Sequence, residues 1–374
     1  MDEAWRAGGK SVKLGFTGDL MLGRSVNQRL LSGASAAAAI WGDVRPEMLA
    51  ADAMIGNLEG PITAQTTRWP RRKAFYFRAD PSPGIAALKE GNYRCVALAN
   101  NHMLDFADQG LFDTRKHLAE AGIAFAGAGA HDREAAEAAL FDAGGMTIGF
   151  ISITNTVRAF AAGPDRPGTN FWKIRSDRGN RGRLASLVHG LRSGGAGLIV
   201  LSIHWGPNYR WWPPQRYRRF ARSAIDLGID IVHGHSAHVL QAVEFHGNGL
   251  ILYDTGDYME DFLPGPGFRS DRSFLFLVDA GPGRTPSLRM VPVSLSRGEV
   301  NVAKGREAEI IRRDMIRRCR GHAVSIVDAN GDLVARPPER APARYGGGGG
   351  AAHTATPAPV PIASARRTAK SRNR

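Results

Sequence analysis

The stretch Val12-Lys-Leu-Gly-Phe-Thr-Gly-Asp19 carries a short apolar run directly into a polar turn. Apolar runs of this length predict buried strands. In layered α/β proteins, ligands bind in the crevice beyond the carboxyl ends of such strands. Asp19 therefore lies where this class of fold places its chemistry.

The same pattern, an apolar run followed by polar residues, recurs four more times along the chain. The polar residues that follow these runs are Asn57-Leu58-Glu59, Asn100-Asn101-His102, His204-Trp205-Gly206 and Gly234-His-Ser-Ala-His238. Carboxylates, amides and imidazoles are the side chains that bind divalent metals or transfer protons. We therefore expect these clusters to meet at one edge of the fold and to form a chemical site.

The composition describes a chain that can build a sizeable core and that favours anionic partners. The 374 residues suffice for one large domain or two small ones, and 43% are hydrophobic. The formal net charge is +14, which predicts attraction to anions but indicates no fold. Two cysteines indicate no disulfide framework, and we expect Cys95 to pack as a small apolar residue.

Targeting signals are not evident in the sequence. The first residues lack a charged-then-apolar signal pattern. No apolar run reaches the roughly 18 residues that a membrane-spanning helix needs. We also find no nucleic-acid recognition motif beside the positive charge. A cytoplasmic protein without a transmembrane segment is the expectation.

Strand-like and helix-like segments alternate from Val12 to about Tyr258, which predicts a layered α/β domain over residues 12–335. Beyond Tyr258, strands are expected at 273–279, 287–295 and 323–335, with Asn330-Gly331 as a hairpin turn. The expected helices are 45–51, 83–90, 109–121, 133–139, 181–192, 214–227 and a basic helix at 306–320.

Residues 336–374 differ from the rest of the chain. They carry eight basic residues against one acidic residue, a run of five glycines and a Pro/Ala/Thr stretch. This composition cannot bury enough apolar surface to fold, so a disordered basic tail is predicted. A solvated tail and a tail that touches nucleic acid or a membrane surface are both compatible with it.

Each polar cluster also has an ordinary structural interpretation. Asp19 suits a turn that caps a helix, and Glu59 precedes a Gly-Pro loop exit. Asn57 and Glu59 point to the same side if their strand continues. Asp105 is close enough in sequence to orient His102. The imidazoles of His235 and His238 favour metal binding or proton transfer over packing, and Asp257 brings another carboxylate towards the same edge.

Two segments that mix basic and aromatic residues flank these clusters, at 68–78 and 209–219. Arg71, Arg72 and Arg210 would bind carboxylate or phosphate groups of a substrate, because guanidinium pairs with both. Asn57 and Asp257 are also expected to contact the substrate. Interleaved aromatics are also typical of single-stranded nucleic-acid platforms, and a solvated surface is a third interpretation. Their position beside the site favours a substrate rim.

The ordered set of motifs resembles the CapA family of poly-γ-glutamate biosynthesis, within the calcineurin-like metallophosphatase superfamily. The matching stretches are Gly18-Asp-Leu-Met-Leu-Gly-Arg24, Asn57-Leu-Glu-Gly-Pro61, Ala99-Asn-Asn-His102 with Asp105, His204-Trp-Gly206, Gly234-His-Ser-Ala-His238 and Gly256-Asp257. They run from about Leu14 to Phe262, roughly two-thirds of the chain, and the ordered set is highly specific.

The resemblance implies a four-layer α/β/β/α sandwich of the metallophosphatase type, with the site at the strand ends. Glu59 would bridge the metal ions, His102 would donate a proton to the leaving group, and Arg24 would face the substrate. The metal ligands carried over by position are Asp19, Glu59, Asn101, His204, His235 and His238.

Two departures from the superfamily pattern point to an incomplete metal site. The first motif normally has a histidine two residues after its aspartate, where this chain has Met21. A thioether is a poor ligand for hard divalent ions. The last motif normally spaces its histidines as Gly-His-x-His, whereas His235 and His238 are one residue further apart. One or two ions of Mn, Fe or Zn are expected.

Three functions remain open at this stage. The first is a metal-assisted hydrolase that acts on a phosphoester or on a γ-glutamyl or other peptide-like amide. The second is an accessory factor that binds an anionic polymer such as polyglutamate without cleaving it. The third is a metal-independent epimerase, in which Asp19 and a histidine exchange protons with a peptide Cα.

Overall fold

The described part of the chain, in a computed structural model, comprises residues 10–33, 35–174, 178–261 and 267–338. Its first strand, β1, is Val12–Leu20, and its last strand, β18, is Asp332–Arg336. The predicted basic tail, from residue 339 onward, lies outside the described residues.

The larger of the two main sheets holds ten strands, in the order β17-β18-β15-β14-β1-β2-β3-β4, with β13 beside β1 and β16 beside β15. Strands β1 to β4 run parallel, whereas β14 to β18 pair antiparallel. Its other strands are β2 Ala53–Leu58, β3 Tyr93–Ala97, β4 Ala124–Ala126, β13 Asp257–Met259, β14 Arg272–Ala280, β15 Ser287–Ser296, β16 Glu299–Val302 and β17 Ser325–Ala329.

The second sheet holds six strands in the order β11-β12-β10-β9-β7-β6, and its centre is parallel. These strands are β6 Ala139–Ala143, β7 Met146–Thr154, β9 Leu198–His204, β10 Ile231–His235, β11 Val243–His246 and β12 Gly249–Leu252. A small separate ladder joins β5, Ala128–Gly129, to β8, Gly168–Thr169.

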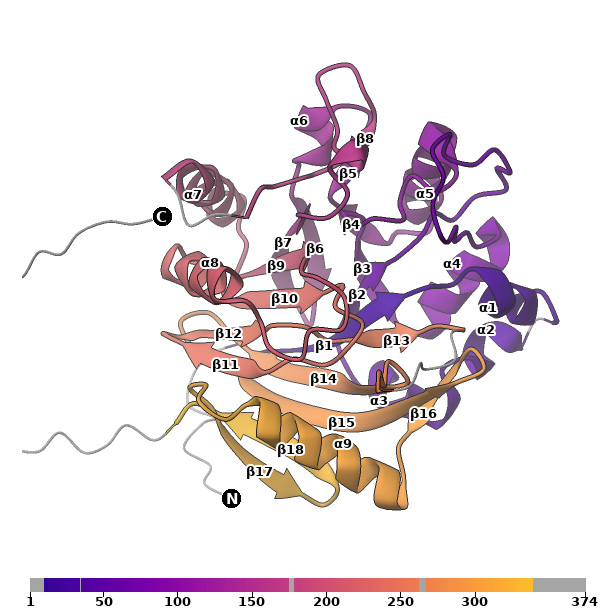
Figure 1. Cartoon of the computed structure of the whole chain (residues 1–374). Helices are drawn as coiled ribbons and strands as arrows, with labels where there is room; N and C mark the ends of the chain where they lie inside the picture. The colour runs from indigo at the N-terminus through magenta and orange to yellow at the C-terminus, as the bar shows by residue number, and fades with distance from the viewer. Residues whose placement is uncertain (1–9, 34, 175–177, 262–266, 339–374) are drawn as a thin grey trace, which may run out of the picture. The chain divides into compact units, whose positions relative to one another are not determined.

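Helices cover the outer faces of the two sheets, with α4 and α5 on one side and α7 and α8 on the other (Figure 1). The α-helices are α1 Arg24–Leu30, α2 Ala36–Ala39, α3 Arg45–Leu49, α4 Pro81–Glu90, α5 Ala107–Glu120, α6 Asp132–Ala135, α7 Arg178–Ser193, α8 Gln215–Asp226 and α9 Gly305–Arg318. Two 3-10 turns lie at Gly42–Val44 and Arg158–Phe160.

Alternation along the parallel strands explains the layering. In β2, Ile55 belongs to the hydrophobic cluster between the sheets, whereas Met54 belongs to the cluster under α4 and α5. Successive side chains of a strand point to opposite faces of the sheet. A strand with apolar side chains on both faces must therefore be covered on both sides. The predicted four-layer α/β/β/α architecture is confirmed.

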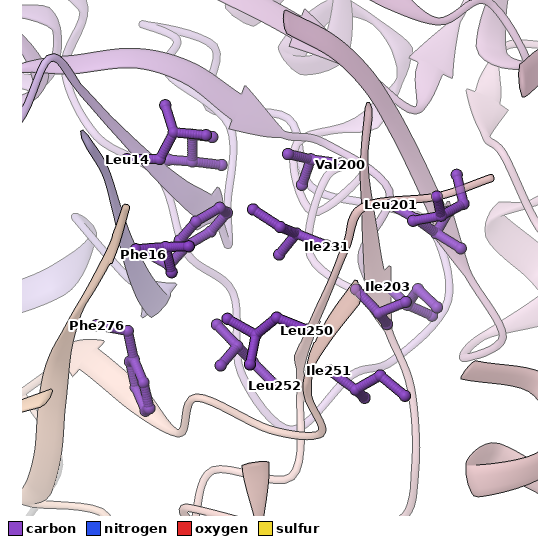
Figure 2. Close-up of a cluster of buried hydrophobic side chains, with 14 of the residues drawn as sticks. Leu14, Phe16, Val200, Leu201, Ile203, Ile231, Leu250, Ile251, Leu252 and Phe276 are labelled. Atoms are coloured by element: carbon purple, nitrogen blue, oxygen red, sulfur yellow. The ribbon is translucent and has the colours of Figure 1, made fainter. Parts of the chain in front are cut away.

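The inner core lies where the two sheets face each other (Figure 2). Leu14 and Phe16 of β1 and Phe276 of β14 contribute to it from the larger sheet, and Ile231 and Leu250 contribute from the smaller one. Each of these five side chains is fully buried. Cys95 is buried in the same cluster, and burial raises the pKa of its thiol, so it packs as the sequence predicts.

Most expected elements are present within a few residues, including the hairpin at Asn330-Gly331, which joins β17 to β18. The expected helix at 133–139 is wrong over its second half, because α6 ends at Ala135 and Ala139 begins β6. The alanines of this segment favour a helix, but the antiparallel pairing of β6 with β7 overrides that preference.

The described residues contain no helix that is both long and apolar enough to cross a membrane.

The packing between the sheets predicts the cost of a cavity there. Leu250→Ala should lower the free energy of unfolding by about 2–5 kcal/mol, since it leaves a void between two apolar sheet faces. Leu140→Ala is the matched control, because Leu140 of β6 is 46% exposed, and its effect should stay within about 0.5 kcal/mol. Urea denaturation followed by circular dichroism measures both, and equal losses would contradict this placement of the core.

Candidate metal and active site

Register within the two sheets brings the polar strand ends together. Asp19 lies opposite Asn57 in the β1–β2 pair, and His204 lies opposite His235 in the β9–β10 pair. The carboxyl ends of these parallel strands converge at one edge of the sandwich. The edge predicted from the sequence therefore exists, and both sheets contribute to it.

The strand ends approach each other closely because glycines leave room for backbone. A Cβ atom on Gly18 would lie 1.8 Å from the carbonyl oxygen of Gly256, and one on Gly234 would lie 2.1 Å from that of Tyr253. The amide of Asp19 donates to the Gly256 oxygen at 3.0 Å. No side chain fits at either glycine, so these positions fix the approach of β1 and β10 to the 253–256 segment.

The first group of potential metal ligands consists of Asp19, His204 and His235, all buried. Their ligand atoms lie within 4.8 Å of one another. The Nδ1 atoms of His204 and His235 are 3.0 Å apart, and His235 Nδ1 is 3.3 Å from Asp19 Oδ1. Two imidazole nitrogens and a carboxylate that face a common point suit a divalent transition metal.

A second group, Asp19, Glu59, His238 and Asp257, lies beside the first and meets the same distance criterion. His238 Nδ1 is 2.7 Å from Asp257 Oδ1 and 3.6 Å from Asp19 Oδ2. Asp19 is common to both groups, whereas the resemblance assigns the bridging place to Glu59. Asp257, expected on the substrate side, lies within this group because β13 pairs with β1 in register at Asp19.

Glu59 is the least satisfied group of the site. It is fully buried, and neither of its carboxylate oxygens has a hydrogen-bond partner among the described residues. Its Oε1 atom lies 3.9 Å from the Nε2 atoms of His102 and His204. Burial, together with the nearby charge of Asp19, raises the pKa of Glu59 well above its usual value. A bound cation would compensate this carboxylate.

The orphaned oxygens of this region extend to two other predicted site residues. Asp257 Oδ2 and Asn101 Oδ1 are also buried without a hydrogen-bond partner among the described residues. Buried polar atoms are nearly always paired, and a site for a metal ion is one ordinary reason for an exception. The residues present therefore fit a divalent metal at this place.

Burial and neighbouring charges shift the pKa values of the surrounding groups. Burial alone would raise the pKa of Asp19, but contact with His235 and the nearby imidazoles lower it. Burial lowers the pKa of His204 well below its usual value, which keeps the ring neutral as a metal ligand requires. Burial also opposes the charged form of His238, but Asp257, Glu59 and Asp19 together raise its pKa.

Asn57 and Asn100 hold the carboxylate side of the site in place. Asn57 Nδ2 donates to Asp19 Oδ1 at 2.7 Å, and Asn57 Oδ1 accepts from Asn100 Nδ2 at 3.0 Å. The sequence predicts that Asn57 contacts substrate; in the structure its side chain bonds to Asp19 and Asn100 and positions the Asp19 carboxylate. His233 packs beside this site; it is fully buried, with its Nε2 atom 2.9 Å from the Thr17 carbonyl oxygen.

His102 sits opposite the metal groups with its own supporting residues. Its Nδ1 lies 2.6 Å from Asp105 Oδ2, as the sequence predicts. Lys73 pairs with the other oxygen of Asp105 and donates to the Asn101 carbonyl oxygen at 2.6 Å. Burial lowers the pKa of His102 although Asp105 opposes this shift. The Nε2 atom of His102 faces Glu59.

A cleft of about 530 Å³ opens over this arrangement, and its lining separates the basic residues that border it from those that do not. Arg71, Arg72 and Arg210 are exposed and do not line it. Arg24 does not line it either, and its Nε is 3.5 Å from Asp261. The cleft is lined by Met21, Lys73, Ala74, Phe75, Phe77, Asn101, His102, Asn208, Tyr209, His238, Asp257, Glu260, Phe268 and Ser270.

Lys73 is the basic residue that sequence reasoning missed. It lies in the basic-aromatic segment that the sequence does single out, but charge alone gave no reason to prefer it over its arginine neighbours. Its ion pair with Asp105 distinguishes Lys73 from the arginines of the same segment and places it at the site. The one local signal in the sequence is Asp105, three residues after His102, because a buried carboxylate there would need a basic partner such as Lys73.

The unpaired carboxylate predicts a pH-dependent stability for protein stripped of metal. Because the pKa of Glu59 is raised above its usual 4.5, the folded state keeps a proton that the unfolded state releases, and stability falls as pH rises through this window. Glu59→Gln should therefore raise the free energy of unfolding by on the order of 1 kcal/mol at pH 8, and this gain should vanish near pH 4.

Thermal unfolding in the presence of a chelator measures this difference across pH. Glu120→Gln is the control, because the Glu120 side chain is 59% exposed. Parallel stability curves for the parent and the Glu59 variant would rule out an uncompensated carboxylate at this position.

Comparison with known proteins places the chain. Residues 13–261 match the family model described as "Bacterial capsule synthesis protein PGA_cap". A probable polyglutamine synthesis accessory protein of Mycobacterium tuberculosis is 34% identical over 310 residues, which are 79% of this chain and 80% of that protein.

Two Bacillus proteins are also similar. The capsule biosynthesis protein CapA of Bacillus anthracis is 27% identical over 77% of this chain and 69% of its own length. The PGA biosynthesis protein CapA of Bacillus subtilis is 29% identical over 66% and 62%. The family match covers every strand end of the site, and this chain belongs to the bacterial capsule synthesis family of CapA-like proteins.

Proposed function

We propose that this protein is a metal-assisted hydrolase of an anionic polymer, which cleaves a γ-glutamyl or similar peptide-like amide, or a phosphoester. The observation that carries the proposal is the buried, unpartnered carboxylate of Glu59 among the imidazoles and carboxylates of the strand ends. A protein that only bound polymer would have no need to maintain such a costly arrangement.

The metal would be held by residues from both sheets. Asp19, His204 and His235 would hold one ion, and Asp19, Glu59, His238 and Asp257 would hold a second. Mn, Fe or Zn suits such mixed nitrogen and oxygen ligands. A divalent ion held there would supply a Lewis acid that lowers the pKa of an attacking water and stabilises negative charge.

Proton delivery falls to His102. Its Nδ1 is engaged by Asp105, so its Nε2 is the atom that faces the cleft and is free to transfer a proton to a leaving nitrogen or oxygen. Lys73 neutralises Asp105 and lies in the cleft wall. The Phe77 ring, with its centroid 4.2 Å from that of His102, helps to keep the imidazole in place.

The chemistry of the cleft supports a substrate with both anionic and apolar parts. Lys73 contributes a positive charge to the wall, and the exposed rings of Phe75, Tyr209 and Phe268 surround the opening. A γ-linked glutamate chain combines carboxylates with methylene groups and fits such a wall. The names of the similar proteins, which refer to capsule, PGA and polyglutamine synthesis, agree with a polymer of this class.

The epimerase alternative receives less support. It requires Asp19 to reach a substrate Cα, but Asp19 is fully buried, bonded to Asn57 and to the amide of Ser236, and absent from the cleft lining. The binding-only alternative requires no metal, so metal content and turnover separate it from the hydrolase.

Metal content is the first test. Protein purified without a chelator or a His-tag should contain close to one or two equivalents of Mn, Fe or Zn by elemental analysis. His235→Ala should lose most of this metal, because it removes a nitrogen ligand from the first group. His189→Ala, at an exposed position on α7, should keep it. A parent protein that stays metal-free after incubation with these ions would refute the mechanism.

The role of His102 predicts a dependence on the leaving group. His102→Gln should lower kcat by about 10²–10⁴-fold on γ-glutamyl amides, whose leaving nitrogen needs a proton. The loss should be much smaller on a nitrophenyl ester, because nitrophenolate leaves without a proton. Metal content should be unchanged. Equal losses on both kinds of substrate would assign His102 to binding or structure.

A further inference from the structure

A second hollow is separated from the candidate active site by two chain segments that contribute residues to both. The cleft over the site takes Asn208 and Tyr209 from one segment and Phe268 from the other, whereas the second hollow takes Trp211 and Arg269 from the same two segments. Its volume is about 460 Å³. The rings of Tyr209 and Phe268, with centroids 4.4 Å apart, stand in the wall of the cleft. The two hollows are therefore bordered by the same two chain segments.

The second hollow is rich in arginine. Most of these arginines have acidic partners: Arg269 is 2.6 Å from Asp271, Arg272 is 3.4 Å from Glu307, and Arg317 is 3.3 Å from Asp314. The complete lining is Trp211, Trp212, Leu240, Gly267, Arg269, Arg272, Ile311, Asp314, Arg317 and Arg318.

Arg318 is the exception among them. It is only 6% exposed, and it makes no hydrogen bond or ion pair with any of the described residues. Its guanidinium lies over the Trp211 ring, 4.4 Å from the ring centroid. An aromatic face orients a guanidinium without using its donors. The five N–H groups of Arg318 therefore remain available.

The surroundings of Arg318 make its isolation costly. Burial lowers the pKa of Arg318 to about 10. The nearby Asp314 carboxylate opposes this shift, whereas the charges of Arg317 and Arg272 add to it. A buried charge without a partner is strongly unfavourable unless an opposite charge joins it. The only carboxylate in the lining, Asp314, is already paired with Arg317.

We propose that this hollow is a second anion-binding subsite, in which Arg318 pairs with a carboxylate of the polymer chain whose scissile bond lies over the metal groups. The ligand class rests on the proposed function. Arg318 would bind a carboxylate through paired N–H groups, and Trp212, which is 61% exposed, would cover the methylene groups of the same unit. The subsite would favour long chains over short ones.

Binding of oligo-γ-glutamate tests the proposal. Fluorescein-labelled oligomer is titrated with chelator-treated protein, and anisotropy gives the Kd for the parent and for Arg318→Met. The variant should bind the long oligomer about tenfold or more weakly, because a charged hydrogen-bonded contact is lost. Free glutamate, which does not span two subsites, should compete poorly with the oligomer in both proteins.

Stability separates a binding role from a structural one. If Arg318 serves to bind a ligand, Arg318→Met should leave the Tm unchanged or raise it, because the substitution removes an unpaired buried charge. Arg306→Gln is the matched control, since Arg306 lies exposed on the same helix and outside the hollow. An unchanged affinity in Arg318→Met, or an equal loss in Arg306→Gln, would overturn the proposal, as would tighter binding of polyphosphate than of oligoglutamate.

The Asp19→Asn variant distinguishes this proposal from the hydrolase. It should lose metal and turnover but keep the Arg318-dependent binding. Absent turnover with intact Arg318-dependent binding in the parent would refute the hydrolase alone. Normal turnover with binding that ignores Arg318 would refute the second subsite alone.

Discussion

The burial of Asp19 is the constraint on which the rest of the site depends. A carboxylate with no exposure to water persists only where hydrogen-bond donors and positive charge surround it. Here an amide from Asn57, the amide of Ser236 and three imidazoles surround it. The parallel strands β1 and β2 provide the amide side, and β9 and β10 provide two of the imidazoles. The two sheets must therefore close on each other before Asp19 is compensated.

The same closure divides the site into two faces with different chemistry. On one face, ligand atoms converge in two groups that share Asp19. On the other, His102 is held by Asp105, which is itself neutralised by Lys73. Glu59 lies between the faces, 3.9 Å from His102 and from His204. The cleft is thus bordered by potential metal ligands on one side and by a supported histidine on the other.

Local sequence patterns were sufficient for the strand ends and insufficient for residues that long-range pairing brings in. Asp19, His204 and His235 each end an apolar run, so the rule for parallel strands places them. Asp257 lies beside Asp19 because β13, which is three residues long, pairs with β1 across more than two hundred residues, and no local pattern predicts that pairing. Lys73 lies in a loop without periodicity, and only its contact with Asp105 distinguishes it from Arg71 and Arg72. The helix propensity of residues 133–139 predicts a helix there, because propensity alone does not include the later pairing of β6 with β7.

The shared position of Asp19 has a mechanical consequence for the whole sandwich. An ion held by Asp19, His204 and His235 would fasten one sheet to the other at the open end of the structure, joining points almost two hundred residues apart along the chain. A fastening across so long a loop removes much of the freedom of the unfolded chain. A bound metal would then have a structural role, as a link between the two sheets, in addition to any chemical role. Loss of the metal would weaken the association of the two sheets at this end, even if every apolar contact of the core remained in place.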